Sequence, residues 1–351
     1  MRPLAASLIF AAAPWAAASA ESEAGGRAVR AEITAEIELS IKRGFEHLVR
    51  KQSVSGEFDS SFPVAANALA GLAFLAGGYT RTTGPEKYAK ALREGTSALL
   101  RYQNRRGYFD DGKSRMYGHG FATLYLAELY GTAGSSGDDV RGALKSAIGV
   151  IEGSQAADGG WDYDPAPQFS ESSKRFSGSD TSITVCQTLA LRAARNLGIR
   201  VDGSVVANAR RYIANAQNSD GGFRYRQGVY GEFFTASAFP RSAAGVCVLY
   251  SLGDYNSPAI RRGFEYLYTN YRLPWSNPFP FYAHYYCAQA MFQAGGKYWR
   301  DYFPWISREL MSGQRSDGSW AAGQNENSTQ ATAMALIVLQ LPYRFLPIHE
   351  R

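Results

Sequence analysis

The chain has 351 residues, of which 45% are hydrophobic, and this composition is typical of a globular protein with enough apolar material for a packed core. Its 37 Lys and Arg exceed its 31 Asp and Glu, which gives a formal net charge of +6. The basic residues are spread along the chain and form no block of the kind that binds nucleic acid. Nucleic acid is therefore not an expected partner.

The first twenty residues form a targeting pattern. Arg2 gives a positive start, residues 4–18 are almost wholly apolar, and Ala18-Ser19-Ala20 is a small-residue cleavage pattern. This is typical of a secretory signal peptide, and the apolar stretch is shorter than the roughly 20 residues that span a membrane. We expect an exported protein, periplasmic or extracellular, that is cleaved near Ala20 and continues with a linker over residues 21–35. An uncleaved anchor is the alternative.

One pattern recurs along the rest of the chain: Gln, three residues, Gly, one residue and an aromatic residue. Its copies begin at Gln52, Gln103, Gln155, Gln217 and Gln314, and they end at Phe58, Phe109, Trp161, Phe223 and Trp320. The last gap between glutamines, 97 residues, fits a sixth, degenerate copy with Thr269 in the Gln place and Trp275 in the aromatic place. Self-similarity at a fixed period indicates a repeat architecture.

Each repeat contains two segments of different character. The segment before the Gln is charged, as in residues 36–51, whose apolar positions fall at the spacing of an amphipathic helix. The segment after the aromatic residue is nearly free of charge: residues 63–77 and 329–341 have none, and residues 239–253 have only Arg241. A helix that is apolar all round must be covered on every side. We therefore predict six pairs, each with an exposed outer helix, a Gln–Gly–aromatic turn and a buried inner helix.

Six such units without a polar capping repeat favour a closed ring over an open solenoid. The sequence thus predicts an all-α protein with a single (α/α)6 toroid over residues 36–348. Cys186, Cys247 and Cys287 lie in apolar helical segments and share no metal-binding spacing, so we expect buried free thiols.

The copies that contain Asp158 and Asp317 read Gln-x-x-Asp-Gly-x-Trp. They resemble the QW repeats of terpene cyclases and the related prenyltransferase/squalene-oxidase repeats of protein prenyltransferase β subunits, and the likeness covers nearly the whole chain after residue 36. The apolar end of the chain is also similar to the closing segment of exported bacterial members of this family. The resemblance implies a toroid with a central, lipophilic cavity.

The functional motifs of these families are incomplete here. Squalene-hopene-type cyclases carry Asp-x-Asp-Asp-Thr at the start of an inner helix, and residues 177–181, Ser-Gly-Ser-Asp-Thr, keep only Asp180 and the Thr. Protein prenyltransferases bind Zn²⁺ through Asp, Cys and His. His284 matches the His position, whereas Arg241 and Ala243 stand at the other two. We therefore predict neither a metal site nor a cofactor.

The mouth of the ring is where chemistry is expected. If the six inner helices are parallel, their N-termini surround one mouth, and their dipoles favour anions and carboxylates there. Asp180 is the strongest candidate for a general acid, if apolar walls raise its pKa; a helix N-cap is the alternative. His119 and His284 also lie beside inner-helix starts and are candidates for a shared catalytic proton transfer. Two buried structural histidines are the alternative to that role.

Six further residues are predicted to bind substrate: Asp110, Asp111, Tyr117, Arg241, Tyr282 and Tyr285. The two carboxylates could bind a cation or Mg²⁺-diphosphate, with a solvated loop or helix cap as the alternative. The arginine could hold an anionic headgroup or form an ion pair with Glu232 or Asp180. The tyrosines could line a cavity and stabilise a carbocation through their π faces, or they could simply fill the core.

Three functions follow from these patterns. The first is a terpene cyclase-like or prenyltransferase-like protein with a central apolar cavity that acts on or binds an isoprenoid or another lipid-like molecule. The second is a non-catalytic ring that binds a hydrophobic ligand or a protein partner. The third is an extracytoplasmic glycan-acting enzyme, in which Trp161, Trp275 and Trp320 would stack on sugars. Whether the chain is an enzyme stays open, as do peripheral contact with a membrane and the oligomeric state.

Overall fold

The computed structural model describes residues 32–132, 138–171, 178–228, 231–320 and 328–349. The predicted signal peptide and most of the predicted linker lie outside these residues. Within them the regular structure is helical, with isolated β-bridges such as the one between Gln103 and Phe109. None of the helices in these ranges has the length and hydropathy needed to span a membrane.

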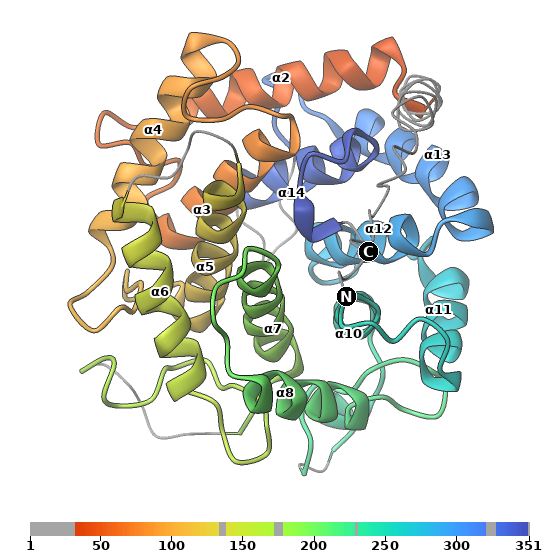
Figure 1. Ribbon diagram of the computed structural model, residues 1–351. Coiled ribbons are helices and arrows are strands. Elements are labelled where there is room, and N and C mark those ends of the chain that lie inside the picture. The colour runs from red at the N-terminus through yellow and green to blue at the C-terminus, as the bar shows by residue number, and fades with distance from the viewer. Residues whose placement is uncertain (1–31, 133–137, 172–177, 229–230, 321–327, 350–351) are drawn as a thin grey trace, which may run out of the picture.

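Six helices form an outer layer: α2 (Ala35–Lys51), α4 (Glu86–Arg101), α6 (Asp138–Gly153), α8 (Gly203–Asn215), α11 (Pro258–Asn270) and α13 (Gly296–Gly313). Six form an inner layer: α3 (Pro63–Ala76), α5 (Arg115–Gly131), α7 (Thr181–Asn196), α10 (Phe239–Ser251), α12 (Pro280–Ala294) and α14 (Ser328–Gln340). The short helix α9 (Glu232–Thr235) precedes α10, and the 3-10 helices η1 (Leu341–Tyr343) and η2 (Pro347–His349) follow α14. The inner helices surround one axis and the outer helices surround them, which confirms the predicted (α/α)6 toroid (Figure 1).

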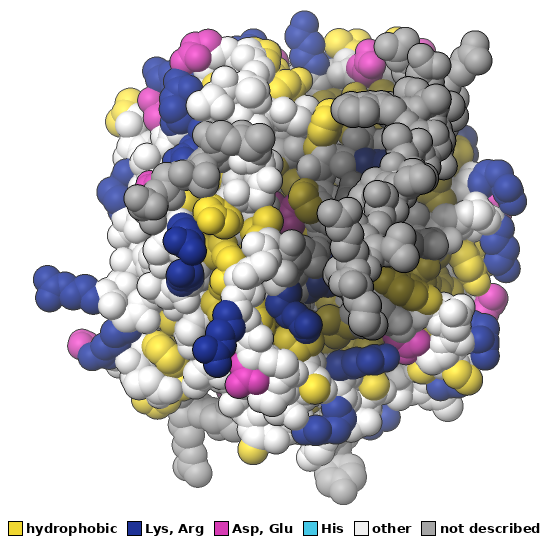
Figure 2. All heavy atoms as spheres, viewed as in Figure 1, with side chains coloured by type: hydrophobic (Ala, Val, Ile, Leu, Met, Phe, Trp, Pro, Cys, Tyr) yellow, Lys and Arg dark blue, Asp and Glu magenta, His cyan; other side chains and the backbone are white. Residues whose placement is uncertain are grey.

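The two layers differ in burial as their sequences predict. In α2 the buried apolar positions Ile37, Ile41, Phe45 and Leu48 recur at helical spacing and face the inner layer, while charged residues face water. By contrast, every residue of the inner helix α3 is buried. Lys and Arg side chains are scattered over the face shown in Figure 2, both at its rim and nearer its centre, and form no single patch there.

The glutamine of each repeat joins its own unit to the next. Gln52 Nε2 donates to the carbonyl of Gly56 in its own turn, at 3.0 Å, and to the carbonyl of Ala91 in the next outer helix, at 2.9 Å. Gln103, Gln155 and Gln217 each make the same two bonds within 3.0 Å. One side chain therefore fixes both the shape of the turn and the position of the neighbouring unit.

The glycine of each repeat permits this close approach. Gly56 has a φ of +89°, and a Cβ atom placed on it would lie 2.4 Å from the carbonyl oxygen of Glu94 in α4. Only glycine adopts this backbone conformation readily and leaves room for the neighbouring helix. The aromatic residue that follows is buried in all five complete copies, where it fills the space between adjacent units.

The ring closes through the same joint. Gln314 Nε2 in the last complete turn donates to the Gly318 carbonyl, at 3.0 Å, and to the Ser40 carbonyl of the first outer helix, at 2.9 Å. The Ser40 hydroxyl donates to Gln314 Oε1 at 3.0 Å, and a Cβ atom on Gly318 would lie 2.3 Å from the Arg43 carbonyl oxygen. In Figure 1 the two ends of the colour scale meet at α2 and α14, which pack against each other.

The sixth, degenerate joint is held differently. Thr269, in the Gln place, is exposed, and the joint relies on the aromatic position. Trp275 Nε1 donates to Glu309 Oε2 of α13 at 3.1 Å, and the indole packs against Phe281 and His284 with ring centres 5.1 Å apart in each case. Side-chain packing thus replaces the amide bridge between the fifth and sixth units.

The C-terminal end of the described chain covers the mouth at the C-termini of the inner helices. Leu346 and Ile348 are buried, and Arg192 Nη1 of α7 donates to the Ile348 carbonyl at 2.9 Å. The chain itself thus packs over this mouth, and the predicted site residues lie at the other mouth, at the N-termini of the inner helices.

The substitution Gly318→Ala tests the closing joint. It places a methyl group against the Arg43 carbonyl and forces alanine into a left-handed conformation, so we expect it to lower the free energy of unfolding by about 2–5 kcal/mol. The matched control is Gly142→Ala on the outer face of α6, where a Cβ atom would meet no atom within 4 Å. That change should be neutral or stabilising by up to about 1 kcal/mol. Denaturant titration measures both, and equal effects would contradict a tight joint at Gly318.

Candidate functional site

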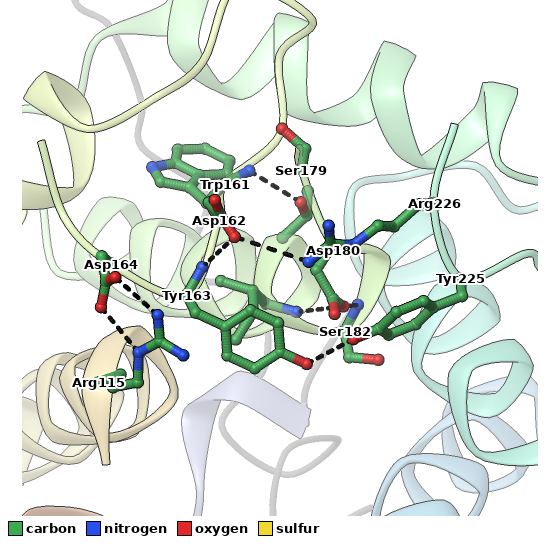
Figure 3. Close-up of polar contacts among 12 residues, drawn as sticks. Arg115, Trp161, Asp162, Tyr163, Asp164, Ser179, Asp180, Ser182, Tyr225 and Arg226 are labelled. Atoms are coloured by element: carbon green, nitrogen blue, oxygen red, sulfur yellow. Dashed lines mark hydrogen bonds and ion pairs between the residues drawn. The ribbon is translucent and has the colours of Figure 1, made fainter. Parts of the chain in front are cut away.

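The N-termini of the inner helices form one mouth of the ring. Every inner helix follows an outer helix through the same kind of turn, so all six inner helices run in the same direction. The candidate site lies at this mouth between α7 and α10. It consists of Asp180, the Tyr163–Tyr225 pair and three surrounding arginines, Arg115, Arg226 and Arg241, and we refer to it as the Asp180 site. Figure 3 labels all of these residues except Arg241.

Asp180 is the N-cap of α7 and is completely buried. Its Oδ1 accepts hydrogen bonds from the backbone N–H groups of Ser182, at 2.7 Å, and Ile183, at 3.3 Å. Its Oδ2, equally buried, has no hydrogen bond of normal geometry among the described residues, although the Tyr225 and Tyr163 hydroxyls lie close enough to this carboxyl to lower its pKa. Burial raises the pKa of Asp180 above its ordinary value, and this effect exceeds the opposing effect of the nearby Tyr225 and Tyr163 hydroxyls and the backbone N–H groups. The N-cap alternative therefore accounts for one oxygen of this carboxyl and leaves the other unused.

Two tyrosines that sequence reasoning missed lie beside this carboxyl. Tyr163 and Tyr225 each stand two residues after the aromatic residue of consecutive repeats, and their hydroxyls are 2.7 Å apart (Figure 3). The coincidence of two tyrosines at one repeat position was the available signal. Burial raises the pKa of both hydroxyls, so both are neutral donors near Asp180.

Arg115 fixes one of these tyrosines from the side. Its guanidinium makes a two-point contact with Asp164, from Nε to Oδ1 and from Nη2 to Oδ2, both at 2.7 Å, and lies 5.0 Å from the centre of the Tyr163 ring. Arg115 itself has a φ of +51°, a conformation that costs a non-glycine residue free energy and is concentrated at functional sites.

Arg241 lies on the other side of the pair, in the first turn of α10. Its Nε donates to the Phe223 carbonyl at 2.9 Å and its Nη2 to the Ala236 carbonyl at 2.7 Å. The guanidinium lies 5.7 Å from the centre of the Tyr225 ring. Arg241 thus donates its hydrogen bonds to backbone carbonyls, and it does not form the ion pair with Glu232 or Asp180 that was the alternative prediction.

His119 occupies a structural position of the repeat. Its Nδ1 accepts from the Phe109 N–H at 3.2 Å, and its Nε2 donates to the Ala147 carbonyl of the next outer helix at 3.1 Å. Asn67 makes the equivalent pair of bonds in the first unit, with Phe58 and Gly95. Burial lowers the pKa of His119 to about 4, so the ring is neutral and both nitrogens are occupied.

His284 stands at the same helix position in the degenerate unit. Its ring packs on Trp275, and its Nδ1 lies 3.0 Å from the Tyr302 hydroxyl. Burial lowers its pKa to about 3. The partners of His284 are distinct from those of His119, so the geometry gives each histidine a separate structural role and gives no support to the predicted shared proton transfer. Aligning the inner helices on the repeat aromatic would have revealed this equivalence from the sequence.

Asp110 and Asp111 act as helix and loop caps. Asp111 Oδ2 accepts from the Val64 N–H at the start of α3 at 3.0 Å, and its Oδ1 accepts from the Ser114 N–H at 2.6 Å. Asp110 accepts from the Gly112 N–H and from the Ser170 hydroxyl, at 2.9 and 3.2 Å. All four carboxylate oxygens thus have protein donors, which is the capping alternative rather than a cation or diphosphate site.

The predicted tyrosines meet across the ring axis. Tyr117 of α5 and Tyr282 of α12 have ring centres 6.3 Å apart, although these helices lie on opposite sides of the ring. One turn deeper, Phe121 and Tyr285 are 6.1 Å apart. At this level aromatic rings from opposite inner helices contact each other across the axis, which narrows the space left for the expected central cavity. The reason is size, because aromatic side chains on opposite inner helices are long enough to meet.

Two clefts lie on the outer surface. One, of about 470 Å³, is bordered by Arg195 of α7 and Arg210 of α8, and the other, of about 500 Å³, by Gly56 and Arg93. Neither involves a predicted site residue.

Comparisons with known proteins bear on the fold. No family model matches the chain, and no curated protein matches its sequence. Among solved structures, the type II terpene cyclase MstE from Scytonema is similar, with a TM-score of 0.60 and 15% identity over 89% of this chain and 99% of that one. The α-1,6-mannanase of Salegentibacter sp. HEL1_6 has a TM-score of 0.63 and 10% identity over 87% and 98% of the two chains. A family 76 glycoside hydrolase from a bovine Bacteroides thetaiotaomicron strain has a TM-score of 0.62 and 12% identity over 88% and 77%.

These likenesses establish the shared α/α toroid and nothing finer, because every identity is 15% or lower. The cyclase has been solved with geranylgeranyl dihydroxybenzoate and the mannanase with α-1,6-mannotriose. The same ring therefore accommodates an isoprenoid chemistry and a glycan chemistry in other proteins. The choice for this chain depends on the residues at its own mouth.

The pH dependence of stability tests the state of Asp180. Its pKa is raised above the ordinary 3.8, so above about pH 4 the unfolded chain releases a proton that the folded chain keeps. Stability due to this group is highest at low pH and falls as the pH rises toward the folded-state pKa. An asparagine in its place would cap α7 equally well and would not titrate. We expect Asp180→Asn to gain stability relative to the wild type as the pH rises from about 3.5 to about 7.

The control is Asp202→Asn at the N-cap of the outer helix α8. Asp202 is exposed and its pKa is lowered by the Ser204 hydrogen bonds, so its effect has the opposite sign: the Asn variant should lose stability relative to the wild type as the pH rises through the carboxyl range. Thermal unfolding across this pH range measures both differences. A difference for Asp180→Asn with the same sign as the control would mean that the buried carboxyl is ionised at low pH.

Proposed function

We propose that this protein is an enzyme that uses Asp180 as a Brønsted acid on an unsaturated, isoprenoid-type substrate. The observation that carries the proposal is the asymmetry of one buried carboxyl group, in which Oδ1 accepts two backbone N–H bonds and Oδ2 accepts none. A protonated Oδ2 is held toward the mouth by the N-cap geometry of α7. This is the arrangement of a proton donor, because the charge left on the carboxylate is stabilised through the other oxygen.

The reaction class that fits is an intramolecular cyclisation. The Oδ2 proton is transferred to one carbon of a C=C bond, the π electrons form the new C–H bond, and the adjacent carbon becomes a cation. A second C=C bond of the same molecule attacks this cation, and loss of a proton from the product cation to the carboxylate restores the acid. Substrate and product are isomers, so neither an oxidant nor a cofactor is needed.

The surroundings of Asp180 support cation chemistry. Tyr117, Tyr163, Tyr225 and Tyr282 are all close enough to interact electrostatically with this carboxyl, and aromatic faces stabilise a neighbouring cation. Apolar walls also exclude water, which would otherwise trap the cation. Entry of a substrate requires the Tyr117–Tyr282 pair to separate, which side-chain rotation can provide.

We also propose that the protein acts outside the cytoplasm, as its N-terminal pattern predicts. Soluble prenyl diphosphates are cytoplasmic, so an exported protein would lack the usual donor of a prenyltransferase. This favours a cyclase-type reaction on a diphosphate-free substrate. It also agrees with the capping role of Asp110 and Asp111, whose oxygens are occupied by protein donors.

The second candidate function is a non-catalytic ring that binds a lipid-like ligand or a protein. It is favoured by the aromatic contacts across the axis, which leave little preformed space for a reacting chain. The glycan-acting alternative is supported by the likeness to the two glycoside hydrolases, and Trp275 is partly exposed. Trp161 and Trp320 do not contribute to it, because they are buried and donate their Nε1–H to the carbonyls of Ile151 and Leu310. Neither indole face is available to a sugar.

Turnover of candidate substrates distinguishes these functions. The purified protein is incubated with squalene, geranylgeraniol and geranylgeranyl dihydroxybenzoate, and products of unchanged mass but new retention time are sought by chromatography with mass detection. We expect cyclised isomers from the wild type and from Asp202→Asn, and a loss of at least about 100-fold in Asp180→Asn. Binding without conversion in all three proteins would support the non-catalytic ring. Equal turnover by wild type and Asp180→Asn would remove Asp180 as the acid.

A further inference from the structure

Not every charged side chain around the Asp180 site has an oppositely charged side chain within ion-pair distance. Arg115 is paired with Asp164 at 2.7 Å, and Arg226 lies 3.8 Å from Asp162. In the part of the chain that the structure describes, Arg241 has no Asp or Glu oxygen within ion-pair distance, and its two hydrogen bonds go to backbone carbonyls. The described acid that acts electrostatically on Arg241 is Asp180, whose own charged form is disfavoured by burial, so the site carries one cation without an ion-pair partner among the described residues.

Arg241 is also poorly solvated and rigidly held. It is about half-buried, and burial lowers its pKa, which shows that its charge is partly removed from water. A desolvated cation without a counter-ion is unfavourable. The bonds to Phe223 and Ala236 use Nε and Nη2, whereas Nη1 makes no hydrogen bond to a described residue. These two hydrogen bonds thus fix the orientation of the guanidinium and leave its Nη1 group available to donate to a ligand.

A second observation points to a ligand at the same place. Asp180, at the start of the neighbouring helix α7, is completely buried, and its Oδ2 has no hydrogen-bonding partner among the described residues. Beyond Arg241, the Tyr225 ring lies 5.6 Å from that of Phe233, whose side chain is 71% exposed. A positive group, an unused polar atom and an exposed apolar surface therefore adjoin one another.

We propose that Arg241 binds the anionic headgroup of an amphipathic ligand, a carboxylate or a phosphate on an apolar chain. This inference depends on the proposed function in one respect, because it places the ligand in the Asp180 site. It restricts the substrate class of that site to acidic isoprenoid or lipid molecules. The headgroup contacts the guanidinium of Arg241, which carries the neutralising charge, and the apolar chain packs on Tyr225 and Phe233. Among the acids at the site, Asp162 and Asp164 each face an arginine, and burial disfavours the charged form of Asp180, so none of the three strongly repels an anion.

Calorimetric titration with three matched probes tests this assignment: dodecanoate, dodecyl phosphate and dodecanol, each below its micellar concentration. The variants are Arg241→Met, which keeps an apolar stem, and Arg241→Lys, which keeps the charge. The control is Arg224→Met in the loop before α10, where Arg224 Nε donates to Asn218 Oδ1 at 3.1 Å. Circular dichroism confirms that each variant is folded.

We expect the wild type and Arg224→Met to bind at least one of the two anions. Arg241→Met should lose about tenfold or more of that affinity, Arg241→Lys should keep part of it, and dodecanol binding should not change. The stronger anion identifies the headgroup. The proposal is overturned if the wild type binds neither anion, if Arg241→Met binds them as well as the wild type does, or if it loses dodecanol to the same extent. The acid role is tested separately by the turnover of Asp180→Asn, so its failure leaves the binding result for Arg241→Met intact.

Discussion

The fold depends on one side-chain amide repeated around the ring. The Gln Nε2 group bridges a carbonyl of its own turn and a carbonyl of the next outer helix, and the glycine of that turn lets the two backbones approach. Removing this donor would leave a buried carbonyl without a partner, which would lower the stability of the fold by about the free energy of a lost hydrogen bond. Every complete joint uses the same bridge, and the last of these bridges joins the final turn to the first outer helix.

Most of this architecture could be predicted from the sequence, because it is repeated. Five copies of one spaced pattern identify the turns, and the difference in charge between the segments on either side identifies the layers. In agreement with that difference, every residue of the inner helix α3 is buried, whereas the outer helix α2 is only partly buried. The aromatic contact across the axis could not be predicted, because it depends on how far Tyr117 and Tyr282 reach from opposite helices. Periodicity says which residues face inward but not whether they meet.

The site was predicted less completely, and the reason is local hydrogen bonding. Asp180, His119 and His284 were all singled out by residue type and by their place at inner-helix starts, which does not show the hydrogen bonds that each side chain makes. In the ring the two histidines occupy the position that Asn67 holds in the first unit, and their environment makes them neutral. The Tyr163–Tyr225 pair went unrecognised because its members are 62 residues apart in the chain and become neighbours only when consecutive units pack.

Closure of the ring by the common joint is the claim on which the position of every residue at the mouth depends. A double-mutant cycle between Ser40→Ala and Gln314→Ala tests it most directly, because the Ser40 hydroxyl bonds to Gln314 Oε1 across the seam between the first and last turns. Denaturant unfolding of the wild type, both single variants and the double variant should give a coupling free energy of about 0.5–1.5 kcal/mol. Additive effects, with no coupling between the two positions, would contradict a closed ring.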